Sequence, residues 1–395
     1  MTIPGNWQRA ARGAMLVGQD GQLRPTIFAE MSALSTQTGA INLGQGFPDE
    51  DGPAEVLEAA RQAISDGFNQ YPPGIGHAVL REAIAEHQQR FYGIPVDPAT
   101  EVLVTAGATE ALAATILALT EPGDEVVTFE PFYDAYGAMI TLAGARHVRV
   151  PLRAPDFQPD LDALAKAVTS KTRLILVNAP HNPTGSVFPV ETLQLIIELA
   201  EQHGATIVTD EVYEHLTFNK QRHTPISSLP GGWERTVTIS SGGKTFSTTG
   251  WKIGWITAPS RLIGPILAVK QFLTFVNGGP FQPAIAAGLR LPDEFFATAA
   301  ATLERKCALL SAGLVDAGFT VSTPQGGYFV IADAAPLGHT DAAAFCRQLP
   351  ALAGVVGVPL SAFTRTEGGS LVRFAFCKRE SVLEEAVERL SALRA

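Results

Sequence analysis

The chain has 395 residues and a mass of 41.9 kDa, and a length prior of about 150 residues per domain predicts two or three domains. Apolar residues make up 46% and charged residues only 17%, which excludes a disordered chain, a collagen and a coiled coil. Because charge is sparse, we expect part of the surface to be covered by a second subunit. The net charge of −10 predicts no electrostatic attraction to nucleic acid or to an anionic membrane.

The three cysteines, Cys307, Cys346 and Cys377, are separated by 39 and 31 positions. An odd number at such distances fits neither a disulfide framework nor a Cys-x-x-Cys metal or redox motif. We therefore expect buried, reduced thiols in a cytoplasmic protein, and no metal site. The first residues, MTIPGN, contain no apolar signal core, and no run of 18 apolar residues predicts a membrane span.

The first 40 residues are polar and predicted to be irregular, apart from a short helical pattern around 27–34. Amphipathic helices are predicted at 55–64 and 78–91. Short β-branched runs then alternate with helical patterns. The expected strands lie at 101–105, 125–130, 174–178, 205–209 and 236–240, with helices among them at 109–119 and 190–203. This alternation predicts an α/β fold with a mainly parallel sheet covered by helices on both faces.

After Pro292 the pattern changes. The expected elements are a long helix at 293–318, strands at 319–322 and 328–332, a further helix, a strand at 371–377 and a final helix at 381–393. We interpret the last hundred residues as a smaller α/β domain.

Polar motifs follow several predicted strands at their carboxyl ends, where open α/β sheets bind ligands. The segment 105–110 (TAGATE) joins a strand to a helix whose N-terminus favours a phosphate, although such junctions are also common as purely structural turns. The segment 178–185 (NAPHNPTG) presents Asn182 from a loop that two prolines stiffen, although Asn-Pro and Thr-Gly also form plain turns.

Three charged residues stand out by their positions. Asp210 ends a predicted strand, where it either caps the next helix or holds a cationic ring nitrogen. Lys244 lies between glycines and Phe246, which makes it a candidate for a desolvated, reactive amine; the P-loop alternative fails because Thr238 stands where that motif needs Gly. Arg373, within an apolar strand, lies either on an exposed edge or where its planar fork grips a carboxylate.

Taken in order, these segments resemble the class I and II aminotransferases of pyridoxal-5′-phosphate (PLP) fold type I. The match begins at 41–48 (INLGQGFP) and ends in the strand around Arg373, with family-like gaps of 28 from Asn182 to Asp210 and 34 from Asp210 to Lys244. The resemblance implies PLP, a homodimer with shared active sites, and a large domain with a mainly parallel seven-stranded sheet between helices. It also implies an N-terminal arm with part of the small domain over 1–45, the large domain over 46–290 and the small domain over 291–395.

The resemblance gives Lys244, Asp210 and Tyr213 catalytic roles. Lys244 resembles the Schiff-base lysine that also moves the substrate proton, with Lys252 as its rival. Asp210 resembles the residue that pairs with the pyridine nitrogen and keeps it protonated, so that the ring acts as an electron sink. Asn182 and Tyr213 resemble the pair that hydrogen-bonds the phenolate oxygen.

Other residues resemble ligands of the cofactor or the substrate. Tyr133 matches the aromatic residue stacked on the ring, with Tyr136 as the alternative, and Tyr71 the residue that reaches the partner subunit's phosphate. The implied phosphate ligands are the backbone N–H groups of Ala108 and Thr109, the hydroxyl of Ser241, and Lys252. The implied ligands of the substrate α-carboxylate are Gly46, Asn182 and Arg373.

The predicted function is ping-pong transfer of an amino group between an amino acid and a 2-oxo acid. Segments 28–34, 278–283 and 372–379 are most similar to the actinobacterial N-succinyldiaminopimelate aminotransferases of lysine biosynthesis, which favours N-succinyl-LL-2,6-diaminopimelate and 2-oxoglutarate as substrates. The alternatives are a kynurenine-, glutamine- or methionine-type aminotransferase and a PLP-dependent cysteine-conjugate β-lyase. An aminotransferase-like domain of a transcription regulator would need a basic DNA-binding domain before residue 41, and the net acidity argues against it.

Overall fold

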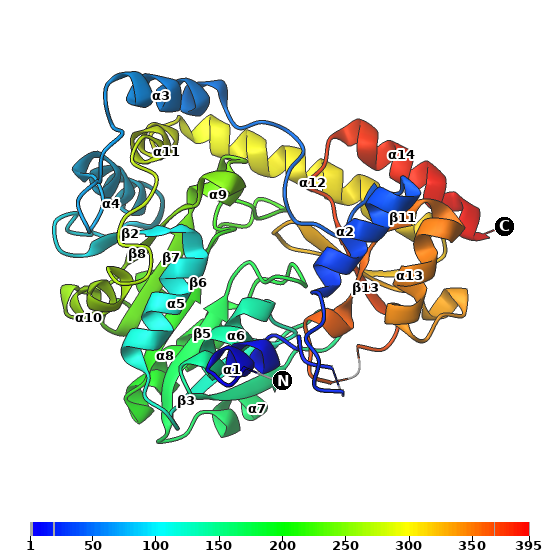
Figure 1. Ribbon diagram of the computed structural model, residues 1–395, viewed down its shortest axis with the longest axis horizontal. Coiled ribbons are helices and arrows are strands. Elements are labelled where there is room, and N and C mark those ends of the chain that lie inside the picture. The colour runs from blue at the N-terminus through cyan, green and yellow to red at the C-terminus, as the bar shows by residue number, and fades with distance from the viewer. Residues whose placement is uncertain (1–2, 19, 367, 395) are drawn as a thin grey trace.

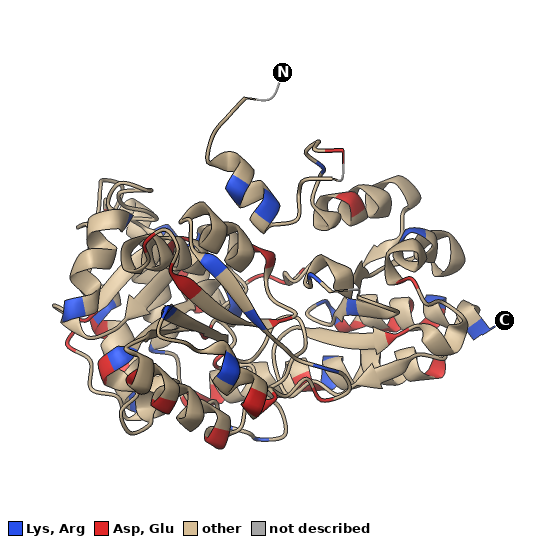
Figure 2. Cartoon of the chain, turned by 90° about the horizontal axis from the view of Figure 1, so that it is seen from below, with Lys and Arg blue, Asp and Glu red and all other residues tan. Residues whose placement is uncertain are grey.

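A computed structural model describes residues 3–18, 20–366 and 368–394. A seven-stranded sheet with its helices forms one part of the molecule, and a four-stranded and a two-stranded sheet belong to the other. The 24-residue helix α12 (Asp293–Asp316) runs from the first part to the second (Figure 1). Lys and Arg are interspersed with Asp and Glu over both parts (Figure 2).

The large sheet has the strand order β2-β8-β7-β6-β5-β3-β4. All its strands are parallel except β8, which is antiparallel to both of its neighbours. The sheet is therefore mostly parallel, as the sequence predicts. Its strands are β2 (Val102–Ala106), β3 (Glu125–Glu130), β4 (Arg146–Pro151), β5 (Thr172–Asn178), β6 (Thr206–Asp210), β7 (Thr236–Ser241) and β8 (Ile253–Thr257).

Helices cover both faces of this sheet because its strands are apolar on both sides. In β5, Leu174 and Leu176 pack into one core cluster and Ile175 and Val177 into another, as the alternation of side chains along a strand requires. The helices on the first face are α5 (Gly107–Leu119), α6 (Asp134–Leu142) and α10 (Ser260–Lys270). Those on the second face are α7 (Leu161–Ala167), α8 (Val190–His203), α3 (Ala54–Ser65), α4 (Ala78–Tyr92) and α11 (Phe281–Leu289).

Segments from both ends of the chain build the other part of the molecule. The helix α2 (Ile27–Thr38) packs against α13 (Ala342–Ala353), and β1 (Ile41–Asn42) pairs in parallel with β11 (Val355–Val356). In Figure 1 the blue α2 accordingly lies among orange and red elements. The four-stranded sheet is antiparallel, with the order β12 (Val358–Pro359), β13 (Leu371–Ala375), β10 (Phe329–Asp333) and β9 (Thr320–Ser322), and the last helix is α14 (Glu380–Leu390).

The prediction that the first 40 residues are irregular except near 27–34 is wrong. A helix, α1 (Trp7–Gly13), forms there and packs against α6. The two helices approach closely because both contact positions lack a side chain: a Cβ on Gly13 would lie 2.2 Å from the carbonyl oxygen of Gly137. All three cysteines are free and buried, which confirms that they form no disulfide. None of the helices in the described ranges combines the length and apolar character needed to cross a bilayer.

Candidate active site

Several strands of the large sheet meet at one edge. β2 ends there at Ala106, β5 at Asn178, β6 at Asp210 and β7 at Ser241. Because β8 runs in the opposite direction, its first residue, Ile253, lies at the same edge, paired with Ala106. The residues next to these strand ends surround a cavity of about 210 Å³.

One wall of the cavity is the N-terminus of α5. Gly107 has φ +70°, a left-handed conformation that favours glycine. A Cβ on Gly254 would lie 2.5 Å from the carbonyl carbon of Gly107 and 2.7 Å from the nitrogen of Ala108, so β8 fits against this turn only because it carries glycine there. The first N–H groups of a helix have no partner within it and favour an anion, and those of Ala108 and Thr109 are in this position.

A positive charge and a hydroxyl complete this wall. The Nζ of Lys252 donates to Thr109 Oγ1 at 3.3 Å, and a Cβ on Gly107 would lie 3.0 Å from the same amine. Ser241, buried at the end of β7, lines the cavity beside them. Helix N–H groups, an ammonium and a hydroxyl together suit a phosphate group.

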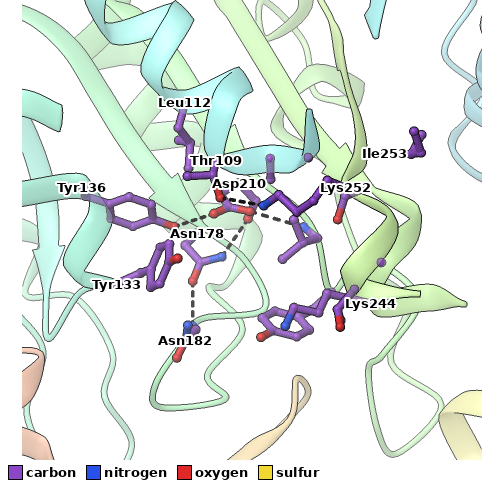
Figure 3. Close-up of a pocket in the computed structure, with 17 residues that line it drawn as sticks. Thr109, Leu112, Tyr133, Tyr136, Asn178, Asn182, Asp210, Lys244, Lys252 and Ile253 are labelled. Atoms are coloured by element: carbon purple, nitrogen blue, oxygen red, sulfur yellow. Dashed lines mark hydrogen bonds between the residues drawn. The ribbon is translucent and has the colours of Figure 1, made fainter. Parts of the chain in front are cut away.

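The floor of the cavity carries the buried carboxylate of Asp210. Tyr136 donates its hydroxyl to Asp210 Oδ2 at 2.7 Å, and the Asn178 amide donates to the Asp210 carbonyl oxygen at 2.8 Å. Figure 3 shows the carboxylate with Tyr136 on one side and the two lysines on the other. Burial raises the pKa of Asp210 to about 6, against the lowering effect of the Tyr136 hydrogen bond. A cationic ligand beside it would restore its ordinary acidity.

Lys244 presents its amine to the same cavity from α9 (Gly242–Thr245). Its Nζ donates to the carbonyl oxygen of Gly46 at 2.8 Å, and its own carbonyl oxygen accepts from the Tyr328 hydroxyl at 2.6 Å. The rings of Tyr213 and Tyr328 lie 5.8 and 5.4 Å from the amine. Burial lowers the pKa of Lys244 to about 8, so about a tenth of this amine is neutral and nucleophilic at pH 7, far more than for an ordinary lysine.

Arg373 lies deep in β13, surrounded by aromatic rings. Its guanidinium carbon is 3.8 Å from the ring centre of Phe329 and 4.4 Å from that of Phe363. Its terminal nitrogens donate to Asn182 Oδ1 at 3.1 Å and to the Gly44 carbonyl oxygen at 2.7 Å, whereas the buried Nε has no partner in the structure. A buried guanidinium with an unmet donor fits a carboxylate ligand.

A family model described as aminotransferase class I and II matches residues 38–390. The chain belongs to this family. Its members use PLP, and the enzyme is therefore an aminotransferase of a PLP-dependent family.

Relatives match the aminotransferase along almost its whole length. It is 50% identical to the probable N-succinyldiaminopimelate aminotransferase DapC of Mycobacterium tuberculosis over 94% of this chain and 98% of that protein. It is 39% identical to the methionine aminotransferase of Escherichia coli over 94% and 97% of the two chains. The solved structure of N-succinyldiaminopimelate aminotransferase from Mycobacterium tuberculosis superimposes with a TM-score of 0.93 at 48% identity, covering all of both chains.

Most of the residues that the sequence singles out lie together in the aminotransferase. Those lining the cavity are Ala108, Thr109, Tyr133, Asn182, Asp210, Tyr213, Ser241, Lys244 and Lys252. Gly46 reaches it through the hydrogen bond from Lys244, and Arg373 through the one to Asn182. Tyr71 is not among the lining residues; it lies on the surface with 81% of its area exposed.

The sequence does not predict the roles that three further residues have at this site. Tyr136, expected only as an alternative to Tyr133, forms the hydrogen bond to Asp210, and the two tyrosine rings meet edge to face. Asn178 accepts from the backbone N–H of Asn182 at 2.6 Å and so supports that loop. The hydroxyl of Tyr328 fixes the backbone of Lys244. Asn178 ends a strand beside Asp210, a position that sequence alone indicates; nothing local in the sequence indicates Tyr328.

Proposed function

We propose that this aminotransferase binds PLP in the cavity at the sheet edge and transfers an amino group between an amino acid and a 2-oxo acid. The observation that carries the proposal is the convergence of a phosphate cradle, a buried carboxylate and a buried amine in one cavity. The N-terminus of α5, Ser241 and Lys252 would hold the phosphate, Asp210 the ring nitrogen, and Asn182 with Tyr213 the phenolate oxygen. Tyr133 would cover the ring.

Each side chain then has a defined task. PLP, when bound, supplies an aldehyde that takes up the amino group and a ring that accepts the electrons left behind when a proton leaves Cα. Lys244 binds the cofactor, and as a free amine removes and returns the substrate proton, a role its lowered pKa supports. Arg373 and the amide of Asn182 orient the α-carboxylate. The aromatic rings around Arg373 exclude water from that contact.

For the substrates, we infer N-succinyl-LL-2,6-diaminopimelate as amino donor and 2-oxoglutarate as acceptor, a step of lysine biosynthesis. The support is the 50% identity to the probable N-succinyldiaminopimelate aminotransferase DapC over nearly the full length of both chains. The test is a half-reaction screen, in which the PLP form is mixed separately with N-succinyl-diaminopimelate, glutamate, methionine and kynurenine. Loss of cofactor absorbance should be fastest with N-succinyl-diaminopimelate and glutamate; a response confined to methionine or kynurenine would refute this substrate choice.

A second candidate keeps the cofactor and changes the substrate or the reaction. The 39% identity to a methionine aminotransferase and the 35% identity to a kynurenine–oxoglutarate transaminase support activity on methionine, glutamine or kynurenine. Because removal of the Cα proton also begins β-elimination, a cysteine-conjugate β-lyase belongs to the same group. Release of pyruvate and ammonia from cystathionine in the absence of an oxo acid would identify the lyase.

Replacing Arg373 by alanine should raise KM for every amino donor by about 10²- to 10³-fold while PLP stays bound. Removing one partner of a buried charge pair costs about 2–5 kcal/mol. Arg373 bonds Asn182, whereas the phosphate cradle is formed by Lys252 and the start of α5. Steady-state kinetics and the absorbance of bound PLP measure the two effects. The Arg373→Lys variant keeps the charge without the planar fork and should fall between wild type and Arg373→Ala. Loss of PLP from both variants would contradict the carboxylate role.

We further propose a cytoplasmic homodimer in which Tyr71 reaches the partner subunit's phosphate. Exposed apolar side chains gather near Tyr71, whose ring meets that of Phe275 at 5.5 Å; Phe272 is 84% exposed and Leu273 45%. Such a patch favours burial against another chain. The three buried, unpaired cysteines are consistent with a reducing compartment.

If Tyr71 acts across the dimer, the Tyr71→Phe variant should bind PLP about tenfold more weakly and remain a dimer, because the ring is kept and one hydrogen bond to a charged group is lost. A Phe272→Asp variant should instead dissociate, since it places a charge in the apolar patch. Equilibrium dialysis of PLP and sedimentation velocity distinguish the two. A fully active wild-type monomer at micromolar concentration would contradict the shared site.

A further inference from the structure

A second cavity, of about 460 Å³, lies apart from the active site. Its walls are α4, the segment after β6 and the start of α12, and none of its lining residues also lines the active-site cavity. The segment after β6 faces both cavities: Asp210 and Tyr213 point into the active site, whereas Glu214 and His215 line the second cavity.

Within the part of the chain that the structure describes, His87, Glu214 and His215 form a group of metal-ligating side chains. One ligand atom from each lies within 4.8 Å of the others. His87 comes from α4, and the other two follow β6. His87 is 1% exposed and Glu214 4% exposed, whereas His215 is half-buried at the cavity wall.

The hydrogen bonds of this group leave donor and acceptor capacity unused. The Nε2 atoms of His87 and His215 are 2.6 Å apart, so only one of these two nitrogens can carry a proton in that contact. The buried Nδ1 of His87 has no partner. An imidazole binds a metal ion through the lone pair of such a nitrogen.

The carboxylate of Glu214 stands beside the two rings. Its Oε1 accepts from the Ser240 hydroxyl at 2.5 Å, and the Tyr92 hydroxyl also hydrogen-bonds this carboxylate. Both donors are neutral hydroxyls, whereas a buried carboxylate is normally paired with a cation or a metal ion.

The charged groups around Glu214 are already paired with other residues. Arg90, which lines the same cavity, forms an ion pair with Asp293 and lies over the rings of Phe91 and Phe296. His223 pairs with Glu211 at 2.8 Å. Glu214 thus remains as the carboxylate of this buried cluster that has no cationic partner of its own.

We propose that His87, Glu214 and His215 bind one zinc ion. Two imidazole nitrogens and one carboxylate oxygen are a common zinc donor set, with a fourth position left for water, which the adjoining cavity supplies. Zinc–nitrogen distances of 2.0–2.1 Å place two tetrahedral nitrogen ligands about 3.3 Å apart, so the two rings separate by less than about 1 Å on binding. His215, at the cavity wall, has the space for this movement.

The ion would link His87 on α4 to Glu214 and His215, which follow β6. Glu214 and His215 lie within five residues of Asp210, and Asp210 and Tyr213 face the active-site cavity. The zinc site is therefore a clamp behind the cofactor cavity and takes no part in the chemistry proposed there.

The test measures zinc on the tag-free PLP enzyme. The protein is stripped with a chelator and dialysed against limiting ZnCl₂ with excess MgCl₂, and bound metal is counted by mass spectrometry. We expect one zinc per chain, and in the His87→Gln and His215→Gln variants a loss of affinity of at least about 100-fold. Affinity is read by competition with a chromogenic zinc indicator. Bound cobalt in place of zinc should give the visible absorption of a tetrahedral site, absent from both variants.

The experiment needs a histidine variant outside the cluster as control. His203, in the last turn of α8 and outside both the three-residue cluster and the lining of the second cavity, serves as control, and His203→Gln should bind zinc like wild type. His215→Gln lies at a cavity wall and tests the site even if His87→Gln fails to fold. Wild-type enzyme without zinc after dialysis, or variants with unchanged zinc content, would overturn the proposal and leave a hydrogen-bonded histidine pair.

Discussion

The Lys244→Ala variant is expected to lose transamination by at least about 10⁴-fold in kcat while still binding PLP without a covalent bond. Lys244 would be both the amine that attaches the cofactor and the base that moves the proton, and a positioned base alone contributes up to about 10⁴-fold. The phosphate cradle at the start of α5 and Asp210 remain in place to hold the cofactor. Borohydride treatment followed by mass spectrometry should add the cofactor's mass to wild type and not to the variant.

The control is the other lysine of the cavity. Lys252→Ala should bind PLP more weakly, because its amine lies at the start of α5 beside Thr109, yet it should be labelled by borohydride like wild type. A covalently fixed cofactor in Lys244→Ala would falsify the assignment and identify Lys252 as the attachment site.

Burial of Lys244 also sets the pH dependence of cofactor capture. Only the neutral amine attacks an aldehyde, and burial lowers its pKa to about 8. The rate at which the cofactor-free enzyme captures PLP should therefore rise with pH through about 8 and level off above it, measured by stopped-flow absorbance. A rate that kept rising toward pH 10 would indicate an amine with its ordinary pKa.

The Asp210→Asn variant is expected to lose at least about 10³-fold in kcat and, without cofactor, to be more stable than wild type near pH 7.5. The loss of activity follows because an amide cannot hold the ring nitrogen in its protonated form. The gain in stability follows because the buried carboxylate is costly to ionise. Its folded pKa of about 6, against an ordinary value of 3.8, corresponds to on the order of 3 kcal/mol.

The stability difference between wild type and Asp210→Asn should depend on pH. A folded pKa above the unfolded value favours the native state at low pH, and this contribution is lost as the pH rises through about 6. The Tm difference between the cofactor-free proteins should therefore shrink below about pH 6. With PLP bound the order should reverse, because the ring nitrogen then pairs with the wild-type carboxylate. Equal Tm values for both proteins in both states would contradict a buried, functional carboxylate.

Much of the large sheet follows from local sequence patterns. The strand at 125–130 and the helix at 190–203 have the predicted bounds, since β-branched and amphipathic periodicity mark them clearly. The sequence does not predict strand β8, because its short sequence IGWIT contains Gly254 and follows Gly250. One of its two antiparallel partners, β2, lies more than 140 residues earlier in the chain. The seven-residue α1 has no apolar periodicity, and its packing on α6 holds it.

The sequence predicts the site residues that lie at strand ends, but it does not predict those that the packing of separate elements brings together. Asp210 and Ser241 end neighbouring parallel strands, and such ends converge in any sheet of this type. The hydrogen bond between Tyr136 and Asp210 spans 74 positions and requires the angle at which α6 leaves the sheet. The rings of Phe28, Phe329 and Phe363 around Arg373 also come from separate elements. No local sequence pattern indicates that these three rings lie together.

The parallel pairing of β1 with β11 joins residues more than 300 positions apart, and it sets an order of events during synthesis. The proposed cofactor ligands of a single chain lie between 108 and 252, whereas Arg373 leaves the ribosome roughly 120 residues later, some 6 to 24 s at about 5–20 residues per second. Before residues 355 and 356 are synthesised, β1 has no partner strand. A growing chain of this enzyme therefore contains all the proposed cofactor ligands of its own subunit before Arg373, the proposed ligand of the substrate carboxylate, is synthesised.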